Sequence, residues 1–171
     1  MGASDWLENI YCEHAPALFR FLLRLTGEES ETREVLQDIF VRLAKDPRLL
    51  DNVAAPRSYL FRLAHRLVID HYRRDQTRRR YDDHAYQERD TSIAPEPPET
   101  DTLWLRETLA TALNELPPEQ RAVVALKVWE EMTFAEIAHV LDLPANTAAS
   151  RYRYALDKLR DHLRPLQRDL P

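Results

Sequence analysis

The residues best suited to chemistry are the arginines and tyrosines gathered between Arg57 and Tyr81. This stretch holds eight Arg against Asp70 and Asp75, a net charge of +6, in a 171-residue chain whose formal net charge is −5. Guanidinium groups bind phosphate oxygens bidentately and stack on base planes, and tyrosine rings stack on unpaired bases. These residue types favour a nucleic acid with exposed bases, and the alternative is a solvated basic helix face.

Helical spacing separates the apolar residues of this stretch from its arginines. One side carries Leu60, Leu63, Ala64, Leu67 and Val68. The other side carries Arg62, Arg66, Asp70, Arg73 and Arg74. We therefore predict an amphipathic helix that buries the first side and shows the second to solvent or to a ligand.

The composition is that of a soluble globular protein, with 44% hydrophobic and 31% charged residues. Only two Gly occur and no run alternates β-branched residues, so we expect an all-α protein. No apolar run approaches the roughly 18 residues of a membrane span, which predicts a cytoplasmic protein without membrane insertion. The single Cys12 has no partner for an internal disulfide.

An acidic segment at residues 82–101 divides the chain. It contains seven acids against one Arg, a net charge of −6, and three prolines. Low apolar content, like charge and proline are typical of a flexible linker. We therefore expect two small helical domains, residues 1–81 and residues 102–171, joined by this acidic, proline-containing linker.

The first domain should contain further helices ahead of the arginine stretch. Apolar spacing from Trp6 to Gly27 predicts two helices, or one kinked near Pro16. A second helix, capped by Ser30, should run to Asp46. Its apolar stripe is Val35, Leu36, Ile39, Phe40 and Leu43. Its outer side, a solvated surface by pattern alone, is Glu34, Gln37, Asp38 and Arg42. Residues 48–57 should form a loop.

The second domain should end in a helix-turn-helix. Thr133 and Glu136 have capping-box spacing, and a turn through 142–144 should lead to a last helix over 145–163. The buried side of that helix is predicted to be Ala148, Tyr152, Ala155, Leu156 and Leu159. Ahead of it, Ala125, Val128 and Trp129 should continue an apolar pattern. Such a unit places its second helix in the DNA major groove, and the alternative is an ordinary helical hairpin.

Three segments resemble bacterial sigma factors of the extracytoplasmic-function group. The arginine helix matches their promoter-melting pattern at Pro56, Tyr59, Leu60, Leu63, Ala64, Asp70, Arg73 and Arg74. The resemblance implies that this region binds and melts the −10 promoter element and holds a flipped base. The residues implied in this role are Asn52, Arg57, Ser58, Tyr59, Arg62, Arg66, Arg73, Arg74 and Arg78.

The preceding helix is similar to the sigma-factor segment that docks on core RNA polymerase. The resemblance implies docking by Leu36, Gln37, Asp38, Phe40 and Arg42. Thr32 and Arg33 depart from the family pattern, which has small and acidic residues there.

Residues 116–160 resemble the domain that reads the −35 promoter element. The matching residues are Leu116, Pro117, Arg121, Glu136, Ile137, Ala138, Leu141, Thr147, Ser150, Arg151, Ala155, Leu159 and Arg160. The implied DNA contacts are Thr147, Ser150, Arg151, Arg153, Tyr154 and Lys158. Asp142 replaces the usual turn glycine, and Ala149 and Tyr154 replace residues that are often basic.

The function that this resemblance implies is promoter-specific initiation of transcription. Its implied partners are core RNA polymerase, promoter DNA in double-stranded and melted form, and an anti-sigma factor, with a monomeric free protein. A stand-alone helix-turn-helix regulator is the second interpretation, but it leaves the docking pattern unexplained. An enzyme using His65, Asp70 and His71 is disfavoured because the histidines lack the i, i+4 spacing of a helical zinc site. We expect no catalytic residue, metal or cofactor.

Overall fold

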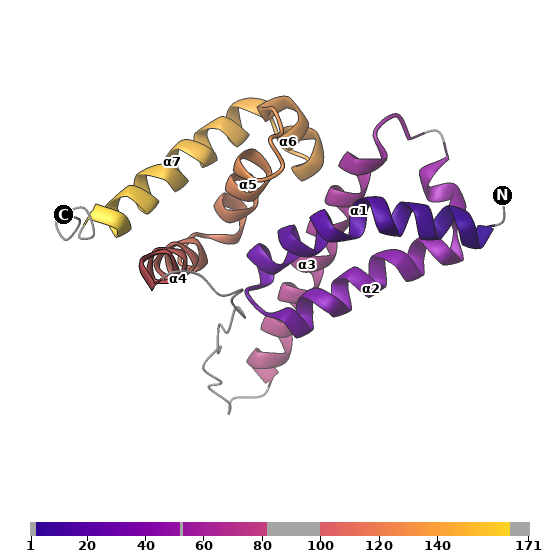
Figure 1. The fold of residues 1–171 in the computed structure, drawn as a ribbon, viewed down its shortest axis with the longest axis horizontal. Helices are drawn as coiled ribbons and strands as arrows, with labels where there is room; N and C mark the ends of the chain where they lie inside the picture. The colour runs from indigo at the N-terminus through magenta and orange to yellow at the C-terminus, as the bar shows by residue number, and fades with distance from the viewer. Residues whose placement is uncertain (1–2, 52, 82–99, 165–171) are drawn as a thin grey trace. The chain divides into compact units, whose positions relative to one another are not determined.

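The computed structural model describes residues 3–51, 53–81 and 100–164, and for residues 3, 4, 75–81 and 100–106 it describes the backbone alone. Within these ranges it contains helices and no strand, which confirms the predicted all-α fold (Figure 1). The chain divides into two compact units, Met1–Ser92 and Ile93–Pro171. The expected linker lies outside the described residues, except that positions 100 and 101 already belong to a helix. No described helix is both long and apolar enough to cross a bilayer.

The N-terminal unit is a helical hairpin packed against a third helix. Helices α1 (Ala3–Thr26) and α2 (Glu29–Lys45) lie alongside each other in opposite directions, and both contact α3 (Pro56–Tyr81) (Figure 1). The structure has one helix where the sequence left two alternatives, and Pro16 lies inside it. The predicted amphipathic arginine helix is thus confirmed as α3, the third side of this bundle.

The core of this unit joins all three helices. Its fully buried side chains include Leu18, Phe21, Leu22, Val35, Ile39, Leu43, Leu60 and Phe61. The rings of Phe21 and Phe61 meet edge to face with centroids 5.1 Å apart, so they connect α1 to α3. Such ring pairs add about 0.5–1.5 kcal/mol to the stabilisation from burial. Neither phenylalanine belonged to a predicted apolar stripe.

The turn between α1 and α2 is stabilised by threonine hydroxyls. Gly27 adopts φ 73°, a left-handed conformation that favours glycine and ends α1. The buried Thr32 Oγ1 donates to the Glu28 carbonyl at 2.8 Å and lies 2.8 Å from Thr26 Oγ1. The predicted cap at Ser30 is wrong, because Glu28 is the N-cap and Ser30 lies in the first turn of α2.

A short 3₁₀ helix, η1 (Pro47–Leu50), occupies part of the predicted loop. The Asp46 carboxylate accepts a hydrogen bond from the Arg48 N–H at 3.2 Å and so caps this turn. Helix α3 then begins at Pro56, where the missing N–H of proline costs no helical hydrogen bond.

The C-terminal unit contains α4 (Thr100–Asn114), α5 (Pro118–Val128), α6 (Phe134–Leu141) and α7 (Ala145–Leu163). Helices α4, α5 and α6 each contact α7. The buried cluster consists of Ala112, Leu113, Leu116, Val124, Ala155 and Leu159. Helix α7 therefore packs against three other helices. Its predicted bounds are confirmed.

The junction between α4 and α5 depends on Arg121. Its guanidinium donates to the Leu116 carbonyl at 3.0 Å and also to the Asn114 carbonyl. The Asn114 carbonyl ends α4 and the Leu116 carbonyl lies two residues beyond it, where no helical N–H is available to them. The spacing of Leu116, Pro117 and Arg121 thus has a structural reason: the arginine returns from α5 to cap α4.

The predicted helix-turn-helix is present as α6 and α7. Thr133 and Glu136 form a reciprocal capping box, with the Glu136 N–H 3.2 Å from Thr133 Oγ1 and the Thr133 N–H 2.7 Å from Glu136 Oε2. Asp142 takes the left-handed conformation, φ 56° and ψ 54°, at the end of α6. Aspartate tolerates this conformation better than most residues, so the turn keeps its shape without glycine.

The apolar pattern of this unit was partly wrong. Leu156 is 38% exposed, although the sequence placed it on the buried side of α7. Val128 and Trp129 are also exposed, at 48% and 36%. Helical spacing does not predict burial at these two positions, because Val128 is the last residue of α5 and Trp129 lies beyond the helix.

Candidate functional site

Helix α3 shows its arginines on the side opposite the core. Leu60, Ala64, Leu67 and Val68 are buried as predicted, and Leu63 is half-buried. The exposed cationic residues are Arg57, Arg66, Arg73 and Arg74. The structure therefore places these four predicted DNA contacts on a solvent-accessible surface.

The beginning of α3 is more closely packed than its end. Ser58, Tyr59 and Arg62 are half-buried, and the Arg57 guanidinium lies 5.4 Å from the centroid of the Phe61 ring. A cation over a ring is held in one orientation more firmly than a free side chain. Of the remaining candidates, Asn52 and the side chain of Arg78 lie outside the described residues.

Of the five candidate docking residues on α2, three are exposed to solvent and two are buried. Gln37, Asp38 and Arg42 are exposed, whereas Leu36 and Phe40 are only 9% and 8% exposed. The difference follows from helical spacing, because positions 36 and 40 point toward α1 while 38 and 42 point away from it. The exposed three form one arc available to a partner.

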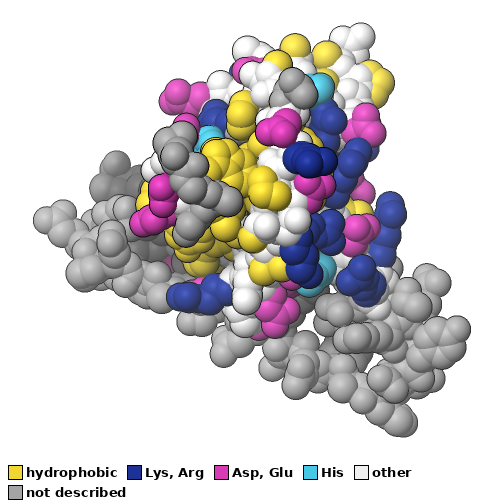
Figure 2. All heavy atoms as spheres, turned by 90° about the vertical axis from the view of Figure 1, so that its right-hand side faces the viewer, with side chains coloured by type: hydrophobic (Ala, Val, Ile, Leu, Met, Phe, Trp, Pro, Cys, Tyr) yellow, Lys and Arg dark blue, Asp and Glu magenta, His cyan; other side chains and the backbone are white. Residues whose placement is uncertain are grey.

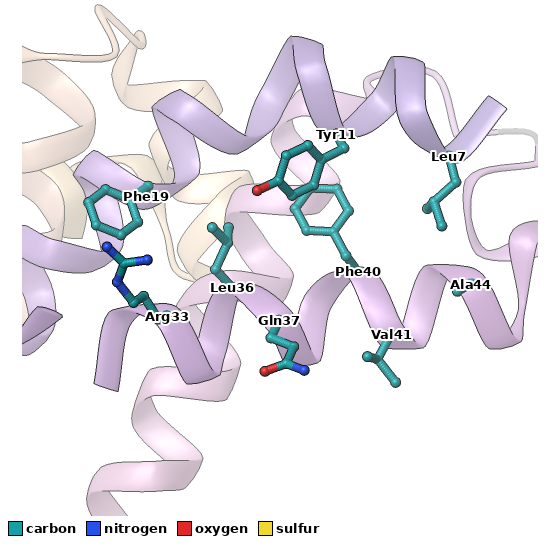
Figure 3. Close-up of a pocket in the computed structure, with 9 residues that line it drawn as sticks. All are labelled: Leu7, Tyr11, Phe19, Arg33, Leu36, Gln37, Phe40, Val41 and Ala44. Carbon is teal, nitrogen blue, oxygen red and sulfur yellow. The ribbon is translucent and has the colours of Figure 1, made fainter. Parts of the chain in front are cut away.

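A groove between α1 and α2 adjoins this arc. It has a volume of about 660 Å³, and its lining residues are Leu7, Tyr11, Phe19, Arg33, Leu36, Gln37, Phe40, Val41 and Ala44. Figure 3 shows the Tyr11 ring from α1 beside the Phe40 ring from α2, and their centroids are 4.7 Å apart. The groove is therefore mostly apolar, with Arg33 and Gln37 as its polar members.

Sequence reasoning missed two large exposed hydrophobic members of the groove. Tyr11 is 50% exposed and Val41 is 40% exposed. Tyr11 lies within the apolar spacing that predicted helix from Trp6 to Gly27, and Val41 stood outside the stripe predicted for the next helix. An apolar residue on the outer side of a predicted amphipathic helix is the signal that would have marked Val41.

A charged surface and an apolar patch lie next to each other in Figure 2. This view, from the right-hand side of Figure 1, shows Lys and Arg side chains, with Asp and Glu side chains among them, beside a patch of hydrophobic side chains. The apolar patch suits the apolar side chains of a protein partner.

One side-chain contact connects the α2 arc to the arginine helix. His71 Nε2 of α3 lies 3.8 Å from Asp38 Oδ2 of α2, a contact that becomes an ion pair when the imidazole is protonated. His65 is half-buried and Asp70 is exposed. Among the described residues, no group of three or more His, Cys, Asp or Glu side chains is arranged to hold a metal ion.

The six candidate DNA contacts on α7 differ in their exposure to solvent. Arg153, Tyr154 and Lys158 are exposed, while Thr147, Ser150 and Arg151 are half-buried. The Ser150 hydroxyl donates to the Thr147 carbonyl at 3.0 Å, which occupies its proton within the helix. On the opposite side, the Tyr152 ring packs against Phe134 of α6 with centroids 5.7 Å apart.

Comparisons with known proteins match both units. The sigma-70 region 2 family model matches residues 10–79, and the sigma-70 region 4 model matches residues 106–159. The chain is 33% identical over 164 residues to the ECF RNA polymerase sigma factor SigL of Mycobacterium tuberculosis, covering 94% of this chain and 90% of that protein. It is 24% identical to the ECF RNA polymerase sigma factor SigX of Bacillus subtilis over 171 residues, covering 97% and 88%.

Solved structures share the fold. The sigma factor RpoE of Bartonella quintana, in complex with the anti-sigma factor NepR, superimposes with a TM-score of 0.79 at 20% identity, covering 94% of this chain and 97% of that one. CnrH, in complex with the cytosolic domain of CnrY, gives a TM-score of 0.64 at 23% identity, covering 93% and 88%.

Proposed function

The chain belongs to the extracytoplasmic-function group of RNA polymerase sigma factors, and we propose that its two units divide promoter recognition between them. A sigma factor directs promoter-specific initiation of transcription as a DNA-binding subunit of RNA polymerase and is not an enzyme. In this proposal residues 1–81 bind core polymerase and the −10 element, and residues 102–171 bind the −35 element. Residues 82–101 are the tether between them.

Core polymerase docks on the exposed arc of α2. Gln37, Asp38 and Arg42 contact it directly, which their exposure supports. Leu36 and Phe40 contribute indirectly, because their buried side chains hold α2 against α1 and so orient the exposed arc. The apolar groove beside the arc offers room for an anchoring side chain of the polymerase.

The arginine helix binds the −10 element. Arg66, Arg73 and Arg74 lie along its exposed side and bind phosphates. Tyr59 and Ser58, with Asn52, hold a base that has left the duplex. Extruding a base costs a few kcal/mol, and the half-buried setting of Tyr59 supports a pocket in which stacking offsets that cost.

Helix α7 enters the major groove of the −35 element. The single observation that carries the proposal is that this helix-turn-helix shares a chain with a docking arc and an arginine helix built into one bundle. A stand-alone regulator of the helix-turn-helix class requires only the C-terminal unit. The match of region 2 to residues 10–79 leaves that alternative unfavoured.

The proposal extends to the state of the protein in the cell. The chain acts in the cytoplasm, where RNA polymerase is found, and is a monomer when free. An anti-sigma factor restrains it by covering surfaces that polymerase needs. The anti-sigma factor named in the RpoE structure supports a partner of this class.

Run-off transcription tests the proposed function. Core polymerase and the purified chain are incubated with a promoter library, and transcripts are sequenced to recover the elements used. We expect transcripts from promoters that share two spaced elements, and none from core polymerase alone. Sequence-specific DNA binding without any transcript would support the stand-alone regulator instead.

A further inference from the structure

Among the described residues of the C-terminal unit, the most exposed aromatic side chain lies on the proposed DNA-reading helix. Tyr154 is 54% exposed, more than any other large hydrophobic side chain of the described residues. Members of the family often carry a basic residue at this position. A neutral ring there changes the chemistry that DNA would meet.

Tyr154 belongs to one stripe of α7. Thr147, Arg151, Tyr154 and Lys158 recur at intervals of four, three and four residues and so share a side of the helix. From Thr147 to Tyr154 the stripe rises about 10 Å, the length of roughly three base-pair steps. The first two members are half-buried and Tyr154 is exposed, so the ring reaches beyond the protein surface.

The ring is oriented by its neighbours. The Arg153 guanidinium lies 5.3 Å from the centroid of the Tyr154 ring. On the other side of the helix, Tyr152 packs against Phe134 and Ala155 is fully buried, which fixes the rotation of α7 about its axis. A tyrosine has only two side-chain torsions to order, so presenting this ring costs little conformational entropy.

A ring in the major groove meets base edges, because paired bases stay stacked and cannot offer their faces. Among those edges, only thymine presents an apolar group, its C5-methyl. An uncharged, oriented ring suits that methyl better than it suits a guanine edge, which arginine reads bidentately. The tyrosine hydroxyl can donate or accept, so it discriminates less between bases.

We propose that Tyr154 is a specificity-determining residue that contacts the C5-methyl group of one thymine in the −35 element. The inference rests on the proposed function of α7 and adds the chemical group that this position reads. Arg153, which lies beside the ring, binds a phosphate at the edge of the same groove.

A methyl deletion scan tests the contact directly. Holoenzyme is bound to duplexes carrying the −35 element recovered from the promoter library, with each thymine replaced in turn by deoxyuridine, which lacks only the methyl. We expect one replacement to weaken binding about fourfold, the effect of exposing one methyl-sized group. The same replacement should not affect the Tyr154→Ala variant.

Two further variants separate ring, hydroxyl and charge. Tyr154→Phe keeps the ring and should retain the fourfold effect. Tyr154→Arg should lose it and gain preference for guanine at that base pair. Leu156→Ala is the matched control, because Leu156 is also exposed on α7 but lies about 200° away around the helix. That variant should behave as the wild type does.

Salt dependence distinguishes a methyl contact from a phosphate contact. Tyr154→Ala should leave the slope of log affinity against log salt unchanged, whereas Arg153→Ala should reduce it by about one. A Tyr154→Ala variant that still responds to the deoxyuridine, or a scan in which no thymine responds, would overturn the inference. Failure of wild-type holoenzyme to bind any −35 element would instead overturn the proposed function itself.

Discussion

The two units present their proposed DNA-binding helices very differently. Helix α3 exposes Arg57, Arg66, Arg73 and Arg74. Helix α7 keeps Arg151 half-buried and exposes Arg153 and Lys158. Near its end, Arg160 lies 3.4 Å from Asp157, and just beyond it Arg164 lies 3.9 Å from Asp161, so acids offset part of its charge. If both helices bind DNA as proposed, we expect α3 to bind mainly through charge and α7 to depend more on side-chain shape and hydrogen bonding.

This difference fits two different substrates. A melted strand offers phosphates and loose bases in many conformations, and arginines tolerate that variety. A duplex offers a fixed groove, where a rigid helix with few well-held side chains discriminates better. The N-terminal unit also carries the proposed docking arc, and α2 and α3 contact each other, with His71 Nε2 3.8 Å from Asp38 Oδ2, so the two proposed sites share one helical bundle.

Phe40→Ala should have the largest effect, because it should destabilise the N-terminal unit and leave the C-terminal unit folded. The ring is 8% exposed and packs on Tyr11, so its loss should lower the stability of the N-terminal unit by about 3–5 kcal/mol. Urea unfolding of the full chain, followed by circular dichroism, measures the change. The C-terminal unit should keep its own transition. A loss below about 1 kcal/mol would contradict the assignment of Phe40 to the core.

The double variant Gln37→Ala, Asp38→Arg should remove docking without unfolding. Both side chains are exposed, so the helical signal should persist while affinity for core polymerase falls by about 2–5 kcal/mol. Binding is measured by titration with fluorescently labelled core polymerase. Glu107→Arg, a charge reversal at an exposed site on α4, is the control and should bind normally. Normal binding by the double variant would reject the arc.

Arginine substitutions in α7 should affect sequence specificity, whereas those in α3 should affect affinity for all DNA sequences. Arg151→Ala should cost about 1–3 kcal/mol at one base pair of the −35 element if the guanidinium reads a base. Arg73→Ala with Arg74→Ala should weaken binding to all sequences and reduce the salt slope by about one for each phosphate that is no longer neutralised. Holoenzyme titrations at several salt concentrations measure both effects. Equal salt slopes for the two variants would remove the contrast between the units.

Thr133→Ala should have the smallest effect, confined to the C-terminal unit. It removes the hydroxyl that accepts from the Glu136 N–H and should cost about 1 kcal/mol. Thermal unfolding measures this loss, and the N-terminal unit should be unaffected. Thr133→Ser keeps the acceptor and serves as the control. Serine and alanine variants of equal stability would show that the cap contributes nothing.

Local sequence signals predicted the features that depend on neighbouring residues. The capping box and the bounds of α7 were both correct, because each depends on contacts within a few residues. The arginine helix was also predicted correctly, because its apolar residues recur with the helical period. Ser30 was wrong as a cap because α2 already begins at Glu29: the Thr32 N–H donates to the Glu28 carbonyl at 3.0 Å, which places Ser30 inside the first turn.

The sequence by itself determined that the chain is helical, where its arginines concentrate, and which patterns it shares with sigma factors. Only the tertiary structure decided how far each predicted apolar side is covered. It confirmed the burial of Leu36 and Phe40, exposed Leu156 on the predicted buried side of α7, and opened the groove beside Tyr11. Helical period fixes which residues share a side, but burial depends on which distant helices pack against that side.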